Sequence, residues 1–330
     1  MQNRNYNTKA IVEAGLISSI LAVLMILTIY VPLFSIVGAF ILPIPVTILY
    51  IRHNLKITLA SVITCTLITS MIFNPTYTIP VLLVMGSQGA ALGYCIKNKK
   101  STWFTLTLLA VVSIVASIMD IAIYISFTSQ GSFMTFVNNQ VNSTKSSMAS
   151  IIQMYKNSGV SEAQLQQLNS SMDILTPEYF IQMIPPILVI IGLVSAWINY
   201  SITRAILKKL RYDVPAVSPF STLYLNNRIG TVILVLMITG ILLDKSNVYI
   251  GKYISTSFQI IFQMVLIADG AALAVYWLKN KLKLSRLVTV LIIILTVTSI
   301  EISMIYIFAG LMDMIFDFRK LDPFRIKKAQ

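Results

Sequence analysis

At residues 128–178 the chain reads TSQGSFMTFVNNQVNSTKSSMASIIQMYKNSGVSEAQLQQLNSSMDILTPE, a polar stretch rich in Ser, Asn and Gln. Long apolar runs surround it: five lie before it, and three runs and a long apolar segment follow it. An apolar run of about 20 residues can cross a bilayer as a helix. The side of the membrane on which residues 128–178 lie therefore sets the orientation of every span.

The composition is that of an integral membrane protein. Hydrophobic residues make up 56% of the 330 residues, charged residues make up 11%, and the mean hydropathy is +0.80. A water-soluble globular domain of this size does not reach these values. The net charge of +13 does not indicate nucleic-acid binding, because Lys and Arg form short clusters between apolar runs rather than a continuous basic face. We therefore expect a lipid bilayer, and no nucleic acid, as a partner.

Eight apolar runs predict an all-α, polytopic membrane helix bundle. Several runs are short, and prolines mark their ends or kink them. The predicted spans cover residues 10–30, 34–51, 57–73, 79–96, 103–127, 180–207, 229–243 and 254–278.

The positive residues predict the orientation, because Lys and Arg collect in cytoplasmic loops. With the N-terminus inside, most of them are cytoplasmic, and between the eight spans only Lys145, Lys156, Lys245 and Lys252 lie outside. We therefore expect a multi-pass protein of a bacterial cytoplasmic membrane, with a cytoplasmic N-terminus. Residues 1–210 form a six-helix membrane bundle with residues 128–178 as its outer loop, and residues 211–330 form C-terminal membrane helices and a short basic cytoplasmic tail.

The last apolar segment, residues 287–318, allows two interpretations. As a single helix it would place Arg319, Lys320 and the rest of the basic tail outside. As two short helices with a turn near residues 298–301, a broken hairpin, it returns the tail to the cytoplasm. We prefer the second form because charges in the tail also influence topology.

The outer loop also shows helical patterns. Ser161 and Gln164 have the spacing of a capping box, and an apolar stripe at helical period follows them. A second amphipathic helix is expected at residues 141–155. We therefore predict two short helices over the outer face, with a mobile linker as the alternative.

Three stretches carry a resemblance to a known family. They are Tyr155 with residues 159–162, the inner-loop run Trp197-Ile198-Asn199-Tyr200 followed by Arg204, Lys208, Lys209, Pro215, Pro219 and Phe220, and Gly310-Leu311-Met312-Asp313 followed by Asp317-Phe318-Arg319-Lys320. Together they resemble the YybS-type family of bacterial multispanning membrane proteins, a domain of unknown function. One departure is Asp269, because an uncharged amide is expected there before Gly270.

That family is in turn distantly similar to S-components of energy-coupling-factor importers. The likeness rests on the six spans of residues 10–207 and on the first helix, where Ala10, Ala14, Ser18 and Ala22 recur every four residues. Small residues let helices approach closely in lipid. In an S-component such a face docks the transmembrane coupling partner, so the resemblance implies that Ala10, Ala14 and Ser18 contact another membrane subunit. Packing within the chain is the alternative.

Asp120 suggests a binding site, because a charged group within an apolar run is costly. It lies seven residues before the outer end of the fifth span. With Gln182, Asn74 and Tyr77 it would line a pocket that opens outward and binds a polar or cationic small-molecule solute. The alternative is a structural hydrogen bond from Asp120 to a neighbouring hydroxyl group.

The C-terminal part contains further charged residues in or beside apolar runs. We expect Asp269 near the middle of the membrane, either protonated or hydrogen-bonded to Gln259, Gln263 or a hydroxyl group, with a proton relay as the less favoured role. Glu301 is a second intramembrane polar residue. The apolar segment ends in a cluster of charged residues, Asp313, Asp317, Arg319 and Lys320. This cluster is suited to contact a partner at the inner face, through Asp313, Asp317 and Arg319, or to anchor the last helix.

No motif indicates catalysis or a metal or cofactor site. Cys65 and Cys95 lie apart within apolar runs and His53 is the only histidine, so a Cys/His metal site cannot be assembled. Nucleotide-binding and hydrolase motifs are also absent from the sequence. Two hypotheses remain: a non-catalytic solute-binding or transport component, and a membrane scaffold or regulator that assembles with envelope or signalling proteins.

Overall fold

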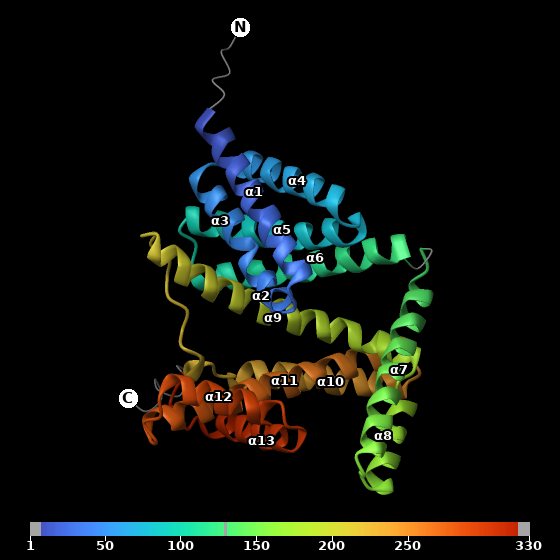
Figure 1. The fold of residues 1–330 in the computed structure, drawn as a ribbon. Helices are drawn as coiled ribbons and strands as arrows, with labels where there is room; N and C mark the ends of the chain where they lie inside the picture. The colour runs from blue at the N-terminus through green and yellow to red at the C-terminus, as the bar shows by residue number, and fades with distance from the viewer. Residues whose placement is uncertain (1–7, 129–130, 323–330) are drawn as a thin grey trace. The chain divides into compact units, whose positions relative to one another are not determined.

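The computed structural model describes residues 8–128 and 131–322, apart from the side chains of residues 33, 35–37, 167, 171, 300 and 301. The described residues form α-helices, one short 3-10 helix and connecting loops, and contain no strand (Figure 1). The chain divides into two compact units. Unit 1 comprises Met1–Phe180 and Leu188–Ala216, and unit 2 comprises Ile181–Ile187 and Val217–Gln330.

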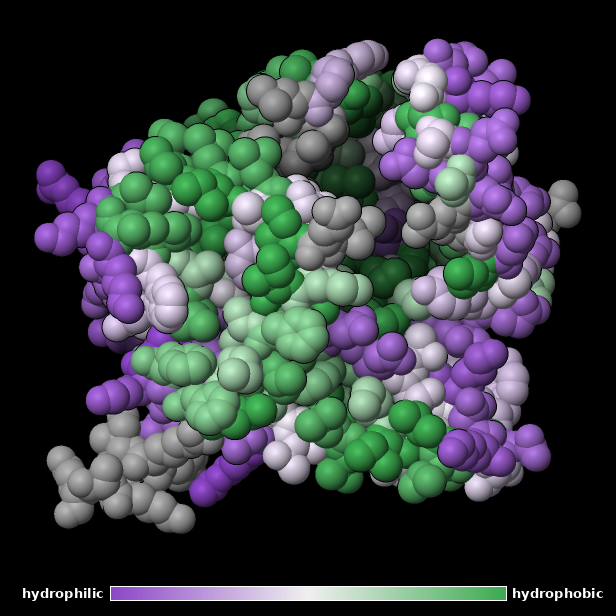
Figure 2. Space-filling model, turned by 90° about the horizontal axis from the view of Figure 1, so that it is seen from below, coloured by the Kyte–Doolittle hydropathy of each residue, from purple (hydrophilic) through white to green (hydrophobic). Residues whose placement is uncertain are grey.

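Seven described helices are long and apolar enough to cross a membrane: α1 (Thr8–Tyr30), α4 (Leu55–Ile72), α5 (Pro75–Lys97), α6 (Thr102–Thr128), α9 (Pro177–Lys209), α10 (Asn227–Lys245) and α11 (Tyr249–Asn280). A pair of shorter helices, bent at a break, counts as an eighth span if it is taken as one. Hydrophobic side chains cover much of the surface that Figure 2 presents, as expected for helices whose outer faces contact lipid rather than water. The all-α, polytopic architecture predicted from hydropathy is thus confirmed.

Unit 1 contains most of the chain before the loop of residues 210–226. The helices before this loop are α1 (Thr8–Tyr30), α2 (Pro32–Ile41), α3 (Pro43–Arg52), α4 (Leu55–Ile72), α5 (Pro75–Lys97), α6 (Thr102–Thr128), α7 (Phe133–Asn157), α8 (Glu162–Asp173) and α9 (Pro177–Lys209). Apolar side chains from α1, α3, α4 and α5 form part of its core, together with Leu42 between α2 and α3. The segment Ile181–Ile187 of α9 belongs to unit 2.

The second predicted span, residues 34–51, is two helices instead of one. α2 ends at Ile41 and α3 begins at Pro43, because proline lacks an N–H group and suits the first turn of a helix. α3 packs on α5, where Thr47 Oγ1 donates to the Gly89 carbonyl oxygen at 3.0 Å. A Cβ atom on Gly89 would lie 2.6 Å from the Pro43 carbonyl oxygen, so this contact requires glycine.

The polar stretch contains the two predicted helices, which form a hairpin of α7 and α8. α7 begins earlier than expected, at Phe133, where the Ser132 side chain accepts a hydrogen bond from the Thr135 N–H group at 3.3 Å. Gly159 has φ 78°, a conformation that glycine adopts without strain, and it turns the chain between the helices. α8 begins directly after Ser161, as predicted. The Ser161 side chain does not cap a backbone N–H group, because its hydroxyl group donates to the Gln164 side chain at 3.0 Å instead.

Unit 2 is built on the helical hairpin of α10 (Asn227–Lys245) and α11 (Tyr249–Asn280), followed by α12 (Arg286–Val297) and α13 (Ile300–Phe316). The hairpin helices approach closely, since a Cβ atom on Gly251 would lie 2.6 Å from the Leu243 carbonyl carbon. The 3-10 helix η1 (Phe220–Thr222) lies in the loop before α10. Leu225, Leu266 and Met314 form an apolar cluster that joins this loop to α11 and α13.

The last apolar segment is broken where the sequence predicts a turn. α12 and α13 are bent by 108° at the break, so the alternative of one long helix is wrong. α12 has 12 residues and is about 18 Å long at 1.5 Å per residue, which is less than the thickness of a bilayer core. α12 therefore cannot cross the membrane alone.

The chain after α13 returns to the loop before α10. The Tyr224 hydroxyl group donates to the Met314 carbonyl oxygen at 3.4 Å, and Arg319 Nη1 donates to the Ser221 carbonyl oxygen at 2.9 Å. Residues 317–322 and residues 217–226 therefore lie on the same side of unit 2. The positive residues of the sequence predict a cytoplasmic loop here, and the tail should then lie on the same side.

Labelling with a membrane-impermeant maleimide in intact cells tests this arrangement. Cysteine introduced at Ser147 on α7 should be labelled, whereas cysteine at Leu223 or Lys320 should react only after the membrane is permeabilised. All three sites are exposed, and the native Cys65 and Cys95 are buried, which keeps background labelling low. Labelling of the Lys320 site without the Leu223 site, in intact cells, would contradict the structure.

Candidate functional site

The four residues predicted to line an outer pocket have different surroundings. Asp120 is half-buried on α6. Asn74 is exposed and caps α5, where its side chain accepts a hydrogen bond from the Thr76 N–H group at 2.9 Å, and Tyr77 is also exposed. Gln182 is buried in the part of α9 that belongs to unit 2. Their role in solute binding stays a prediction.

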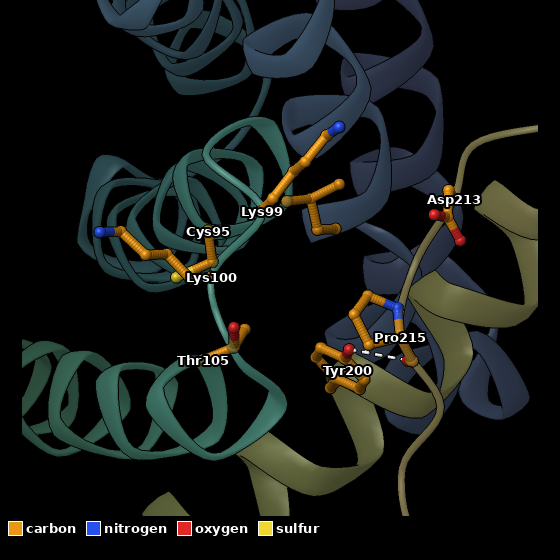
Figure 3. A pocket seen from close by; sticks show the side chains of 8 residues that line it. Cys95, Lys99, Lys100, Thr105, Tyr200, Asp213 and Pro215 are labelled. Atoms are coloured by element: carbon orange, nitrogen blue, oxygen red, sulfur yellow. Dashed lines mark hydrogen bonds between the residues drawn. The ribbon is translucent and has the colours of Figure 1, made fainter.

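A cavity of about 100 Å³ in unit 1 lies elsewhere. Lys99, Lys100, Tyr200 and Asp213 are among the residues that line it. Figure 3 shows that the ammonium groups of the two lysines point away from each other and from Tyr200. The Tyr200 hydroxyl group is already bound to the Pro215 carbonyl oxygen at 2.9 Å. Since its charged groups do not converge, we do not place the functional site here.

The small-residue face of α1 packs within the chain. Ala10 and Ser18 are buried, and the Ser18 hydroxyl group donates to the Ser61 carbonyl oxygen of α4 at 3.0 Å. The Ser61 hydroxyl group donates to the Ala14 carbonyl oxygen at 3.2 Å. A role for Ala10, Ala14 and Ser18 in docking another subunit stays a prediction, and it would require a partner that displaces α4.

Unit 1 contains a cluster of amides and hydroxyl groups, buried apart from the half-buried Ser195, which we call the amide cluster. It comprises Gln88 of α5, Ser113 of α6, and Ser195 and Asn199 of α9. Gln88 Nε2 donates to Ser113 Oγ at 2.9 Å, and Asn199 Nδ2 donates to Gln88 Oε1 at 2.9 Å and to Ser195 Oγ at 3.1 Å. Such bonds between helices hold a membrane bundle together.

The amide cluster has unused hydrogen-bonding capacity. Asn199 Oδ1 is buried without a hydrogen-bond partner, and so is the hydroxyl oxygen of Thr203, one turn further along α9. Sequence analysis missed this cluster, although Asn199 belongs to the stretch that resembles the YybS-type family. The available signal was the presence of Gln88 and Asn199, two amides, inside predicted spans.

Unit 2 contains a second buried cluster, which we call the charge cluster: Asp269 of α11, Asp313 of α13 and Arg319 just after α13. Arg319 Nε and Nη2 donate to Asp313 Oδ2 at 2.9 and 2.7 Å. Nη2 also pairs with Asp269 Oδ1. The exposed fractions of the Arg319 and Asp313 side chains are 0%, and that of Asp269 is 1%. Charged groups so deeply buried in a membrane protein generally have a function.

The close crossing of α11 and α13 brings Asp269 near Asp313. A Cβ atom on Gly270 would overlap the Tyr306 carbonyl oxygen, and one on Gly310 would overlap the Leu266 carbonyl oxygen. The backbones of the two helices can therefore approach only because glycines face each other. Each glycine lies close in sequence to one of the two aspartates.

A tight turn after α13 directs Arg319 back to the two aspartates. Asp317 ends the helix in the left-handed region, with φ 51°, which aspartate adopts more readily than most residues. Its carboxylate accepts hydrogen bonds from the N–H groups of Leu321 and Asp322 at 2.7 and 3.0 Å. The turn thus fixes the segment that carries Arg319.

The predicted partners of Asp269 were wrong: its Oδ1 atom pairs with Arg319 instead of with Gln259, Gln263 or a hydroxyl group. The cluster at the end of the apolar segment is also buried, since Asp313, Asp317 and Arg319 are all less than a tenth exposed. Their proposed contact with a partner stays a prediction. Glu301 lies in the first turn of α13, and its side chain is outside the described residues.

Within residues 8–128 and 131–322, no group of three or more His, Cys, Asp and Glu side chains is placed to hold a metal ion. The charge cluster itself contains three ionisable side chains, two acidic and one basic. With both aspartates ionised, Asp269, Asp313 and Arg319 together carry two negative charges and one positive charge.

Apolar helices with polar contacts buried between them define a polytopic, α-helical membrane protein. The chain belongs to the family described as "Predicted membrane protein (DUF2232)", whose model matches residues 19–314. It is also similar to "Uncharacterized protein YybS" of Bacillus subtilis (strain 168), with 22% identity over an alignment of 256 residues that covers 73% of this chain and 75% of that protein. The predicted resemblance to the YybS-type family is confirmed. No solved structure matches the chain.

Proposed function

We propose that this protein is a non-catalytic component of a membrane transport system, in which unit 1 binds a small polar solute. The observation that supports this function is the amide cluster, because Asn199 Oδ1 and the Thr203 hydroxyl oxygen are buried without hydrogen-bond partners. A buried polar atom that lacks a partner costs about 1–3 kcal/mol. A solute that donates to these atoms would remove that cost.

The chemistry of the amide cluster favours an uncharged polar solute. Amide and hydroxyl groups both donate and accept hydrogen bonds, and the four members of the cluster carry no charge. They come from α5, α6 and α9, so they lie inside the bundle of unit 1. The resemblance to S-components that the sequence suggests favours the same function, and we propose that the protein lies in the cytoplasmic membrane with its N-terminus inside.

Mass spectrometry of small molecules that copurify with the detergent-solubilised protein tests the proposal. We expect wild type to retain a polar small molecule and Asn199→Leu to lose most of it, because leucine removes the unpartnered oxygen and the bonds to Gln88 and Ser195. Asn139→Leu is the matched control, since Asn139 is exposed on α7. Size-exclusion profiles show whether each variant is folded.

Asp120→Ala tests the outer pocket in the same experiment. Loss of the molecule in Asp120→Ala alone would move the binding site to the outer end of α6 and contradict a site at the amide cluster. Stable copurification of an envelope or signalling protein, with no small molecule in any variant, would contradict solute binding. That result would support the scaffold function, for which the exposed Lys208 and Lys209 at the end of α9 and Arg211 in the loop after it offer a basic surface.

A further inference from the structure

We propose that the charge cluster of unit 2 binds one exchangeable proton, carried by the carboxylate of Asp269 or of Asp313. This site would couple the protein to a proton gradient or to pH. The inference does not rest on solute binding, because the amide cluster belongs to unit 1 and the charge cluster to unit 2. Each proposal can therefore fail without the other.

The charges of the cluster do not balance without a proton. Two carboxylates and one guanidinium group leave one negative charge, and the three side chains have between 0% and 1% of their surface exposed. An uncompensated charge buried away from water costs several kcal/mol. Such groups usually take up or release a proton instead. One proton on either carboxylate makes the cluster neutral.

The hydrogen bonds show where the proton would bind. Arg319 Nε and Nη2 donate to Asp313 Oδ2. Nη1 donates to the Ser221 carbonyl oxygen, and Nη2 also donates to Asp269 Oδ1. Arg319 therefore donates hydrogen bonds to only one oxygen of each of the two carboxylates. The other two, Asp269 Oδ2 and Asp313 Oδ1, are buried without a hydrogen-bond partner. A carboxyl group protonated at one of these oxygens would gain a donor that the ionised cluster lacks.

The remaining charged and titratable groups nearby do not neutralise the pair. Asp317 accepts hydrogen bonds from two backbone N–H groups, Asp322 is itself acidic, and the Tyr306 hydroxyl group is bound to Thr296. The Tyr224 ring centre lies 6.0 Å from the Arg319 guanidinium carbon. Arg228 at the start of α10 is exposed. Among the described residues, Arg319 is the cation in ion-pair contact with the two carboxylates.

A proton fits this site better than a metal cation. Calcium takes six to eight oxygen ligands, and magnesium requires nearly octahedral coordination. Asp269 and Asp313 together offer two unpartnered oxygens, and their side chains are inaccessible to solvent. The proton would exchange on the side of residues 217–226 and 317–322, because the backbone of that loop and that turn contact Arg319 and Asp317.

Infrared spectroscopy of the purified, full-length protein tests the proposal, because a protonated carboxyl group has a carbonyl band that shifts in D₂O. At neutral pH, wild type should show a band equivalent to one carboxyl group that is absent from both Asp269→Asn and Asp313→Asn. In each variant the remaining carboxylate pairs one-to-one with Arg319 and stays ionised. Asp244→Asn, an exposed aspartate of the same unit, should leave the band unchanged.

A titration of wild type provides a second measurement if a variant does not fold. Raising the pH should remove the same band with release of one proton per protein, because deprotonation converts the carboxyl group to a carboxylate. A band that persists in both Asp→Asn variants overturns the proposal, as does a wild type with no such band at neutral pH. A band that appears only when sodium is withdrawn would show that a metal cation occupies the site, and would also overturn it.

Discussion

The substitution Arg319→Ala should destabilise unit 2 by about 3–5 kcal/mol, the cost typical of removing one partner from a buried ion pair. Arg319 provides the ion-pair contacts of both Asp269 and Asp313, so alanine leaves the negative charge of this buried pair without a counter-charge. We expect a much lower midpoint of thermal unfolding in detergent, measured by the loss of the monodisperse size-exclusion peak.

The neighbouring Lys320 provides the matched control for this experiment. Lys320 is exposed, so Lys320→Gln removes a positive charge from the same turn with little effect. The loss of stability in Arg319→Lys should lie between the losses in Arg319→Ala and Lys320→Gln. An ammonium group keeps the charge but cannot reproduce the planar guanidinium fork that contacts both aspartates and Ser221. Equal losses of stability for Arg319→Ala and Lys320→Gln would show that the charge cluster does not hold unit 2 together.

The second large effect is expected from Gly270→Ala. A Cβ atom at this position would overlap the Tyr306 carbonyl oxygen, which belongs to the backbone and cannot move aside as a flexible side chain could. The helices α11 and α13 must then separate, at a cost of about 1–3 kcal/mol for overpacking. Gly270→Val should cost more. The same thermal measurement follows both variants.

Gly15→Ala is the control for the effect of a glycine-to-alanine change at a helix position where no neighbouring helix is close. No atom lies within 4 Å of a Cβ atom built on Gly15, which is exposed in the middle of α1. Because alanine is the better helix former by about 1 kcal/mol, this variant should be as stable as wild type or slightly more stable. A Gly270→Ala variant that behaves like Gly15→Ala would contradict the close crossing of α11 and α13.

Hydropathy predicted most helices of this protein, because lipid requires each spanning segment to satisfy its own backbone hydrogen bonds. The runs at residues 10–30 and 103–127 differ from α1 and α6 by only a few residues. The turn near residues 298–301 was also predicted, from the positive charges of the tail. The boundary between α2 and α3 falls at Pro43, one of the prolines that the sequence analysis expected to end or kink a span.

The two buried clusters could not be predicted in the same way. Helical spacing relates a residue to positions three or four away, whereas the Asp269–Arg319 pair spans 50 residues and the Gln88–Asn199 hydrogen bond spans 111. Both contacts depend on how separate helices pack. The sequence showed polar residues inside apolar runs, but it did not show which of them would meet.

The separation of Asp269 and Arg319 along the chain has a consequence for biosynthesis. At about 5–20 residues per second, a ribosome adds the 50 residues between them in roughly 3–10 s. During that time α11 leaves the translocation machinery with an acidic side chain that has no counter-charge. A nascent chain interrupted before Arg319 would keep the Asp269 carboxylate without the ion-pair partner that it has in the complete chain.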